Sequence, residues 1–109
     1  MSVSTTRTDS GGRVAVAGEV DCSTAPQMGA CIDSLLAAAP REVVVDLTAV
    51  TFLDSAGLHA LVTAHARAEE AGVRLRVLVA TRAALRPIQV TGLWDVLGAE
   101  LVERGAGVA

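Results

Sequence analysis

The sequence of 109 residues contains no lysine and no tyrosine, and Phe52 and Trp94 are its only phenylalanine and tryptophan. All of its basic residues are arginines, scattered along the chain, and the formal net charge is −3. Nucleic-acid binding is therefore not expected, because neutralising phosphates requires a cluster of basic side chains. With so few aromatics, the core must be built from Val, Leu, Ile and Ala.

The sequence also lacks an apolar run near the roughly 20 residues that span a membrane. Residues 1–12 are polar and lack the apolar segment of a signal peptide. Cys22 and Cys31 form no C-x-x-C motif, so we expect free, buried or half-buried thiols. Together these features predict a cytoplasmic protein, in which thiols stay reduced, with no membrane partner. No metal or other cofactor of its own is expected.

The apolar content of 51% is typical of a globular chain, and the length predicts one domain over residues 1–109. Within it, we expect residues 13–103 to be well ordered, 1–12 to form an edge strand or a flexible N-terminus, and 104–109 to be a flexible tail.

Strand and helix patterns alternate along the chain. Strands are predicted around 3–8, 13–18, 43–47 and 73–79, with a hairpin turn at 10–12. Helices are predicted over 25–39, ended by Pro40, over 56–71, ended by Gly72, and from a Thr81 cap toward 90. Residues 94–102 form a last helix or strand. This order predicts an α/β fold with a mixed sheet of four to five strands, in which the apolar run 43–47 is covered on both faces.

Ser55 stands between a strand ending near Phe52 and a helix beginning near Ala56, which permits two interpretations. Either Ser55 or Asp54 caps the helix, a role worth about 1 kcal/mol. Alternatively, Ser55 accepts a phosphate, which a helix N-terminus tolerates, while Gly57 leaves the backbone open to another molecule.

Other chemistry at Ser55 is poorly supported. A nucleophilic serine needs a base held against it, but His59 and His65 both lie on the helix that Ser55 opens. The elbow motif G-x-S-x-G is absent, since Leu53 occupies the first glycine position. The histidines are too far apart around the helix to share a metal as an i, i+4 pair would, and we expect His65 to pair with Glu69 or to lie at the core edge. A receiver domain with Asp54 as acceptor would need a lysine.

Two further acidic residues need partners. Asp46 lies in a central strand, where a carboxylate must be hydrogen-bonded, and amides near Thr48 or Thr51 are candidates. Asp21 ends the second strand and is expected to cap the following helix.

Several segments in order resemble one family. Gly18–Asp21 (GEVD) followed by Ser23–Pro26 (STAP) is similar to its opening motif, and 44–47 (VVDL) is similar to its central strand. Val50–Leu58 (VTFLDSAGL) resembles its signature D-S-x-G-L loop, and Ala71-Gly72, Arg86 and Thr91–Leu93 resemble its later landmarks. The family is the STAS domain, and within it the anti-sigma factor antagonists.

This resemblance implies a sheet with helices packed on one face. It implies that Ser55 is phosphorylated, and that Asp21, Asp54, Ser55, Ala56, Gly57 and Leu58 bind the partner. The unphosphorylated protein would bind an anti-sigma factor that is itself a serine kinase, and so release the sigma factor. Phosphorylation of Ser55, using the ATP and Mg²⁺ of the kinase, would end binding, and a serine phosphatase would reset the switch. The protein itself would not be an enzyme.

Two positions depart from the family pattern. Ala56 replaces a second Ser or Thr, which makes Ser55 the clearer acceptor. Pro87 lies where members continue a helix, so the third helix is predicted to be shorter or kinked. The alternative function is that of a STAS subunit in a membrane transporter or a larger signalling assembly.

Overall fold

The computed structural model describes residues 1–103, which form one five-stranded sheet and four helices. The strands are β1 (Ser2–Arg7), β2 (Gly11–Val20), β3 (Glu42–Leu53), β4 (Arg74–Val79) and β5 (Ala99–Leu101). The helices are α1 (Ala25–Leu36), α2 (Ser55–Ala71), α3 (Arg82–Val90) and α4 (Leu93–Leu97). The predicted tail, 104–109, lies outside the described residues.

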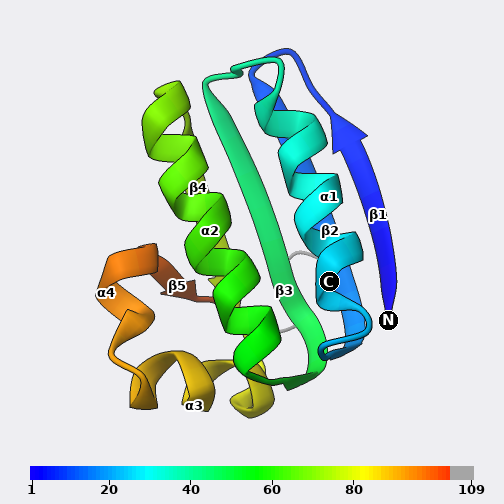
Figure 1. Ribbon diagram of the computed structural model, residues 1–109, viewed down its shortest axis with the longest axis vertical. Helices are drawn as coiled ribbons and strands as arrows, with labels where there is room; N and C mark the ends of the chain where they lie inside the picture. Colours follow the sequence, from blue (N-terminus) through cyan, green and yellow to red (C-terminus); the bar gives the residue numbers. More distant parts are fainter. Residues whose placement is uncertain (104–109) are drawn as a thin grey trace.

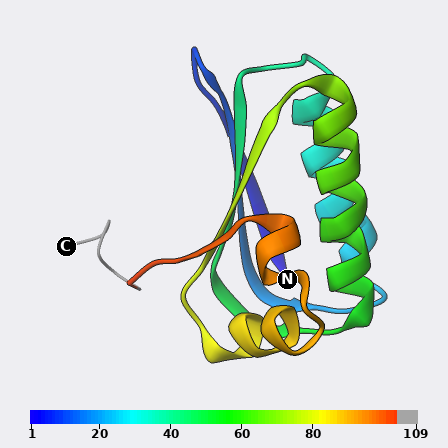
Figure 2. The same ribbon diagram turned by 90° about the vertical axis from the view of Figure 1, so that its left-hand side faces the viewer.

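The sheet has the order β1-β2-β3-β4-β5, with β1 antiparallel to β2 and the other pairs parallel. The predicted mixed α/β sheet is confirmed. Helices α1 and α2 lie side by side against one face, on either side of β3 (Figure 1), and the edge-on view shows the opposite face free of helices (Figure 2). Within residues 1–103, no helix combines the length and hydrophobicity needed to cross a membrane.

The core fills the space between the sheet and α1 and α2. Alternate residues of β3, including Val43, Val45 and Leu47, are fully buried against side chains such as Met28 and Leu61. The residues between them, Val44 and Asp46, are only half-buried. The prediction that both faces of 43–47 are covered is therefore wrong, because the helices pack on one side only.

Strand β3 is also longer than its apolar run. It pairs with β2 over 42–53 but with β4 only over 42–46, so its second half extends past β4. There the carbonyl oxygen of Val50 accepts a 2.6 Å hydrogen bond from the Thr81 hydroxyl, which also receives the Ala84 amide and so caps α3 as predicted. Thr81 thereby holds α3 near the end of the sheet that carries the site.

Three local predictions need correction. Helix α1 ends at Leu36, well before Pro40, because the chain turns at Ala37–Ala39, with Ala39 in a left-handed conformation (φ 46°). The hairpin turn is Thr8–Gly11, so Gly11 already belongs to β2. Pro87 lies inside helix α3, which continues to Val90, so the predicted shortening at Pro87 is wrong, while the alternative of a kink there stays a prediction. Residues 94–102, left open between helix and strand, contain most of α4 and all of β5, separated by Gly98.

Candidate functional site

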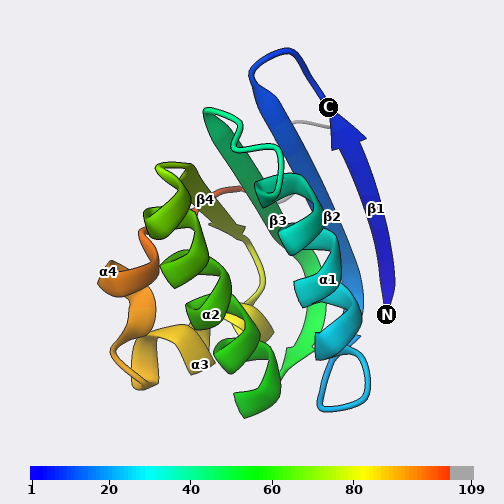
Figure 3. The same cartoon turned by 45° about the horizontal axis from the view of Figure 1, so that its top comes forward.

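The two loops that carry the predicted site residues meet at the carboxyl ends of β2 and β3. Val20 and Leu53 are paired across these strands. The next amide along, that of Asp54, donates a 3.2 Å hydrogen bond to the carbonyl oxygen of Val20. The loop at 21–24, which leads into α1, and the start of α2 therefore lie side by side, as Figure 3 shows from the helix side. This juxtaposition places Asp21 and Ser55 at the same end of the sheet.

Asp54, and not Ser55, caps α2. Its Oδ1 accepts hydrogen bonds from the amides of Ala56 (2.9 Å) and Gly57 (3.2 Å), and its backbone is extended as an N-cap requires. Ser55 is the first residue of the helix and is exposed. None of the hydrogen bonds found among residues 1–103 uses its hydroxyl. Ser55 thus presents a free, exposed hydroxyl on a fixed backbone.

Gly57 and Leu58 face inward. A Cβ on Gly57 would lie 2.4 Å from Leu53 Cδ1 and 3.0 Å from Val20 Cγ1, while Leu58 is buried in the core. The interpretation that Gly57 opens the backbone to another molecule is therefore wrong. Its missing side chain instead lets α2 approach the sheet, which sets the position of Ser55.

Asp21 organises the neighbouring loop. Its Oδ1 accepts hydrogen bonds from the Ser23 hydroxyl (2.7 Å) and amide (3.0 Å), and from the amide and hydroxyl of Thr24 (both 3.1 Å). These bonds, those from Ser23 foremost, lower the pKa of Asp21. The prediction that Asp21 caps α1 is wrong, because the N-cap position is Thr24 and the amides bound by Asp21 belong to the turn before the helix. Thr24 makes no forward side-chain cap; its hydroxyl binds back to the carbonyl oxygen of Glu19 (3.1 Å).

Asp46 belongs to the helix-free face of the sheet rather than to this site. Its Oδ1 accepts the Thr48 amide (2.9 Å), as predicted, and its Oδ2 pairs with Arg13. Burial acts to raise the pKa of Asp46, but the bonds from Thr48 and the charge of Arg13 outweigh it, and the pKa lies below its ordinary value. Asp46 therefore has a structural role.

The histidines and cysteines also take separate places. His65 Nε2 lies 2.6 Å from Glu69 Oε1, as predicted, while His59 is exposed. Cys31 is half-buried, but Cys22 is exposed in the loop beside Asp21, contrary to expectation. Among residues 1–103, no group of three or more His, Cys, Asp or Glu side chains is arranged to hold a metal ion.

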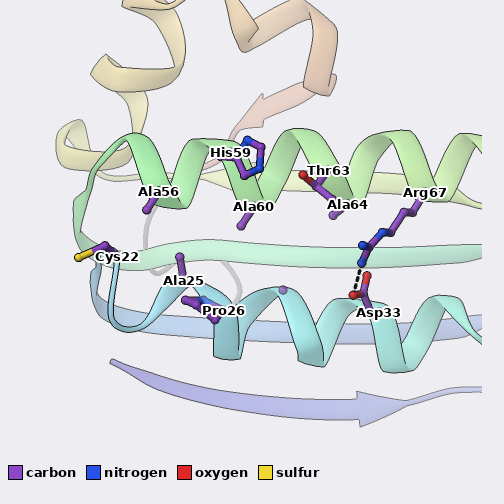
Figure 4. Close-up of a pocket in the computed structure, with 11 residues that line it drawn as sticks. Cys22, Ala25, Pro26, Asp33, Ala56, His59, Ala60, Thr63, Ala64 and Arg67 are labelled. Carbon is purple, nitrogen blue, oxygen red and sulfur yellow. Dashed lines mark hydrogen bonds and ion pairs between the residues drawn. The ribbon is translucent and has the colours of Figure 1, made fainter.

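Sequence reasoning missed one feature of the site, a groove between α1 and α2. It begins at Cys22 and at Ala56, the residue that follows Ser55, and ends at the ion pair of Asp33 with Arg67 (Figure 4). Its lining is mostly alanine, glycine and proline. Such residues carry no recognisable signal until the facing sides of the two helices are known.

Residues 3–103 match the family model described as Mlab, STAS domain. The chain therefore belongs to the STAS domain family, as its motifs predicted.

Proteins in this fold and family include named anti-sigma factor antagonists. The anti-sigma-F factor antagonist RsfB of Mycobacterium tuberculosis is 35% identical over 82 residues, covering 73% of this chain and 65% of RsfB. The chain thus spans just under two thirds of that relative. The crystal structure of an anti-sigma factor antagonist from Mycobacterium paratuberculosis is 32% identical and superposes with a TM-score of 0.82, covering 90% of this chain and 83% of that one. The unphosphorylated anti-sigma factor antagonist SpoIIAA is 16% identical, with a TM-score of 0.79 and coverage of 98% and 93%, which shows a shared fold.

Proposed function

We propose that this protein is an anti-sigma factor antagonist whose binding is controlled by phosphorylation of Ser55. While Ser55 is unphosphorylated, the protein binds an anti-sigma factor that is itself a serine kinase, and the sigma factor is released. The observation that carries this proposal is the exposed Ser55 hydroxyl, free of the capping role that Asp54 fills. The names of the RsfB and Mycobacterium paratuberculosis relatives support the class of partner.

The local geometry suits a reversible phosphate. Because Asp54 already holds the amides of Ala56 and Gly57, a phosphate on Ser55 would extend into solvent and leave the cap intact. It would add a charge of about −1.5 to −2 at neutral pH. The positive end of the α2 dipole favours such a charge by roughly 0.3–1 kcal/mol, so the fold survives modification.

The same charge is costly for a bound partner. If a partner carboxylate lies about 5 Å from one added charge, their repulsion weakens the binding free energy by roughly 3 kcal/mol at an effective dielectric of 20. That corresponds to a loss of affinity on the order of a hundredfold. The neighbouring carboxylates of Asp21 and Asp54 already make this surface acidic. We infer that phosphorylation repels the kinase surface that had accepted Ser55, and that a serine phosphatase restores binding.

In this scheme the protein acts in the cytoplasm as a binding protein and substrate, not as an enzyme. The binding surface comprises the exposed Ser55 with the neighbouring Asp21, Asp54 and Ala56. Gly57 and Leu58 face the core, and they contribute indirectly by setting the distance between α2 and the sheet.

The test is phosphorylation by the anti-sigma factor kinase from the same cells, with MgATP. We expect the intact mass to rise by one phosphate, mapped to Ser55, with no gain in a Ser55→Ala variant and no transfer from acetyl phosphate. Phosphate at Ser4, Ser23 or Thr51 with none at Ser55 would contradict the assignment. A STAS subunit of a transporter or other assembly would instead bind a component of that assembly and gain no phosphate.

A further inference from the structure

The groove between α1 and α2 exists because both helices face it with small side chains. Ala56, Ala60 and Ala64 recur every four residues along α2, and Ala25 and Gly29 have the same spacing on α1. Residues four apart share one face of a helix, so these small residues lie along the groove on both helices, and Pro26, His59 and Thr63 complete the lining between the two ends. Figure 4 shows the alanines pointing into the space and Arg67 reaching across it to Asp33, which closes the far end.

Gly29 has no internal reason to be glycine. It lies within α1 with no unusual φ, and a Cβ added there would meet no atom within 4 Å. Glycine is the poorest helix former after proline, so the chain gives up helix stability at this position without a packing gain. Gly57 is the opposite case, because a Cβ there would lie 2.4 Å from Leu53 Cδ1 and force that side chain to move. A glycine that weakens its helix with no gain in packing within the molecule points to a functional role. At Gly29 that role would be to leave room for a group from another molecule.

The size and lining of the groove indicate what enters it. Its volume of about 290 Å³ corresponds to roughly ten water molecules at about 30 Å³ each. It lies just below the range of about 300–1,000 Å³ typical of small-molecule pockets. The mainly apolar lining favours burial of a hydrocarbon side chain. Ala56, which lines one end of the groove, directly follows Ser55, so a protein that phosphorylates Ser55 lies next to that end.

We propose that the α1–α2 groove receives a bulky apolar side chain, of the Leu or Phe class, from the anti-sigma factor while Ser55 occupies the kinase active site. This inference rests on the proposed function. The Asp33–Arg67 ion pair limits how far the partner segment extends along the helices. The groove thereby contributes partner selection at a distance from the phosphorylated residue.

The test fills the groove and leaves Ser55 untouched. Gly29→Leu adds a side chain on the α1 wall and Ala60→Leu adds one on the α2 wall. The matched control is Ala30→Leu, which adds the same side chain at an exposed position of α1 outside the groove. Binding of the purified kinase that phosphorylates wild-type Ser55 is measured by calorimetry, together with thermal melting and the rate of Ser55 phosphorylation at low kinase concentration.

We expect Gly29→Leu to melt no lower than wild type, yet to bind the kinase at least tenfold more weakly and to be phosphorylated more slowly, with Ala60→Leu showing the same loss and Ala30→Leu none. A folded Gly29→Leu that binds like wild type overturns the inference while phosphorylation of Ser55 stands. So does a wild-type dimer in sedimentation that Gly29→Leu dissociates, since the occupant is then a second copy. If the wild-type protein neither binds the kinase nor gains phosphate at Ser55, the proposed function itself fails, and the groove inference fails with it.

Discussion

The amide nitrogen of Asp54 lies 3.2 Å from the carbonyl oxygen of Val20, and this one hydrogen bond ties the start of α2 to the end of β2. It brings the loop organised by Asp21 next to Ser55, although the two residues are far apart in the sequence. The site therefore depends on strand pairing that continues to the last residues of β2 and β3.

The first prediction concerns the cap of α2. Asp54→Ala removes the acceptor for two amides and should lower the free energy of unfolding by about 1 kcal/mol, or roughly 4–8 °C in melting temperature. Ser55→Ala removes no bond and should melt like wild type. Thermal melts of both variants check this. A larger loss for Ser55→Ala than for Asp54→Ala would mean that Ser55 is the cap.

The second prediction contrasts two glycines. Gly57→Ala forces a methyl group against Leu53 and should destabilise the protein by roughly 1–3 kcal/mol, as overpacking does. Gly29→Ala meets open space and should stabilise it by roughly 0.5–1 kcal/mol, because alanine favours the helix. Urea denaturation measures both. Equal effects of the two substitutions would contradict the packing described for α2.

The third prediction separates the two roles of Asp21. An Asn side chain keeps an oxygen that can accept the Ser23 and Thr24 amides, so Asp21→Asn should melt close to wild type. If the carboxylate also contacts the partner, kinase binding or phosphorylation should weaken in the same variant. Unchanged binding by calorimetry would leave Asp21 with the structural role alone.

The fourth prediction is a pH dependence from Asp46. Its pKa in the folded protein lies below the ordinary 3.8, so its contribution is complete above about pH 4–5 and disappears as the pH falls through the folded value. Asp46→Asn should cost about 1 kcal/mol at neutral pH, since the Arg13 side of the pair is half exposed. That difference should shrink below about pH 4. Urea titrations across pH 2–7 measure it, and a constant difference would contradict the ion-pair account.

Local patterns in the sequence were enough to predict the features that depend on capping and turn residues close in sequence. The left-handed Gly72 after α2, the Thr81 cap of α3 and the bond from Asp46 to the Thr48 amide all depend on residues close in sequence. The identity of the cap of α2 could not be settled, because Asp54 and Ser55 are both good capping residues.

Features that join segments distant in the sequence could not be predicted from the sequence alone. The ion pair of Arg13 with Asp46 and that of Arg76 with Glu100 depend on strand order and register. Strand β5 has only three residues, too few for a recognisable pattern. The role of Gly57 appeared only once Leu53 and Val20 were placed beneath it.

The most direct test of the central claim compares the affinity of the anti-sigma factor kinase for four forms of the protein: wild type, Ser55→Ala, Ser55→Asp and wild type phosphorylated at Ser55. Calorimetric titration of each is run beside a thermal melt. We predict melting temperatures close to one another, tight binding by wild type and Ser55→Ala, and binding weaker by on the order of a hundredfold after phosphorylation, with Ser55→Asp also weakened. Phosphorylated protein that remains folded and binds the kinase as tightly as the unmodified form would contradict the account.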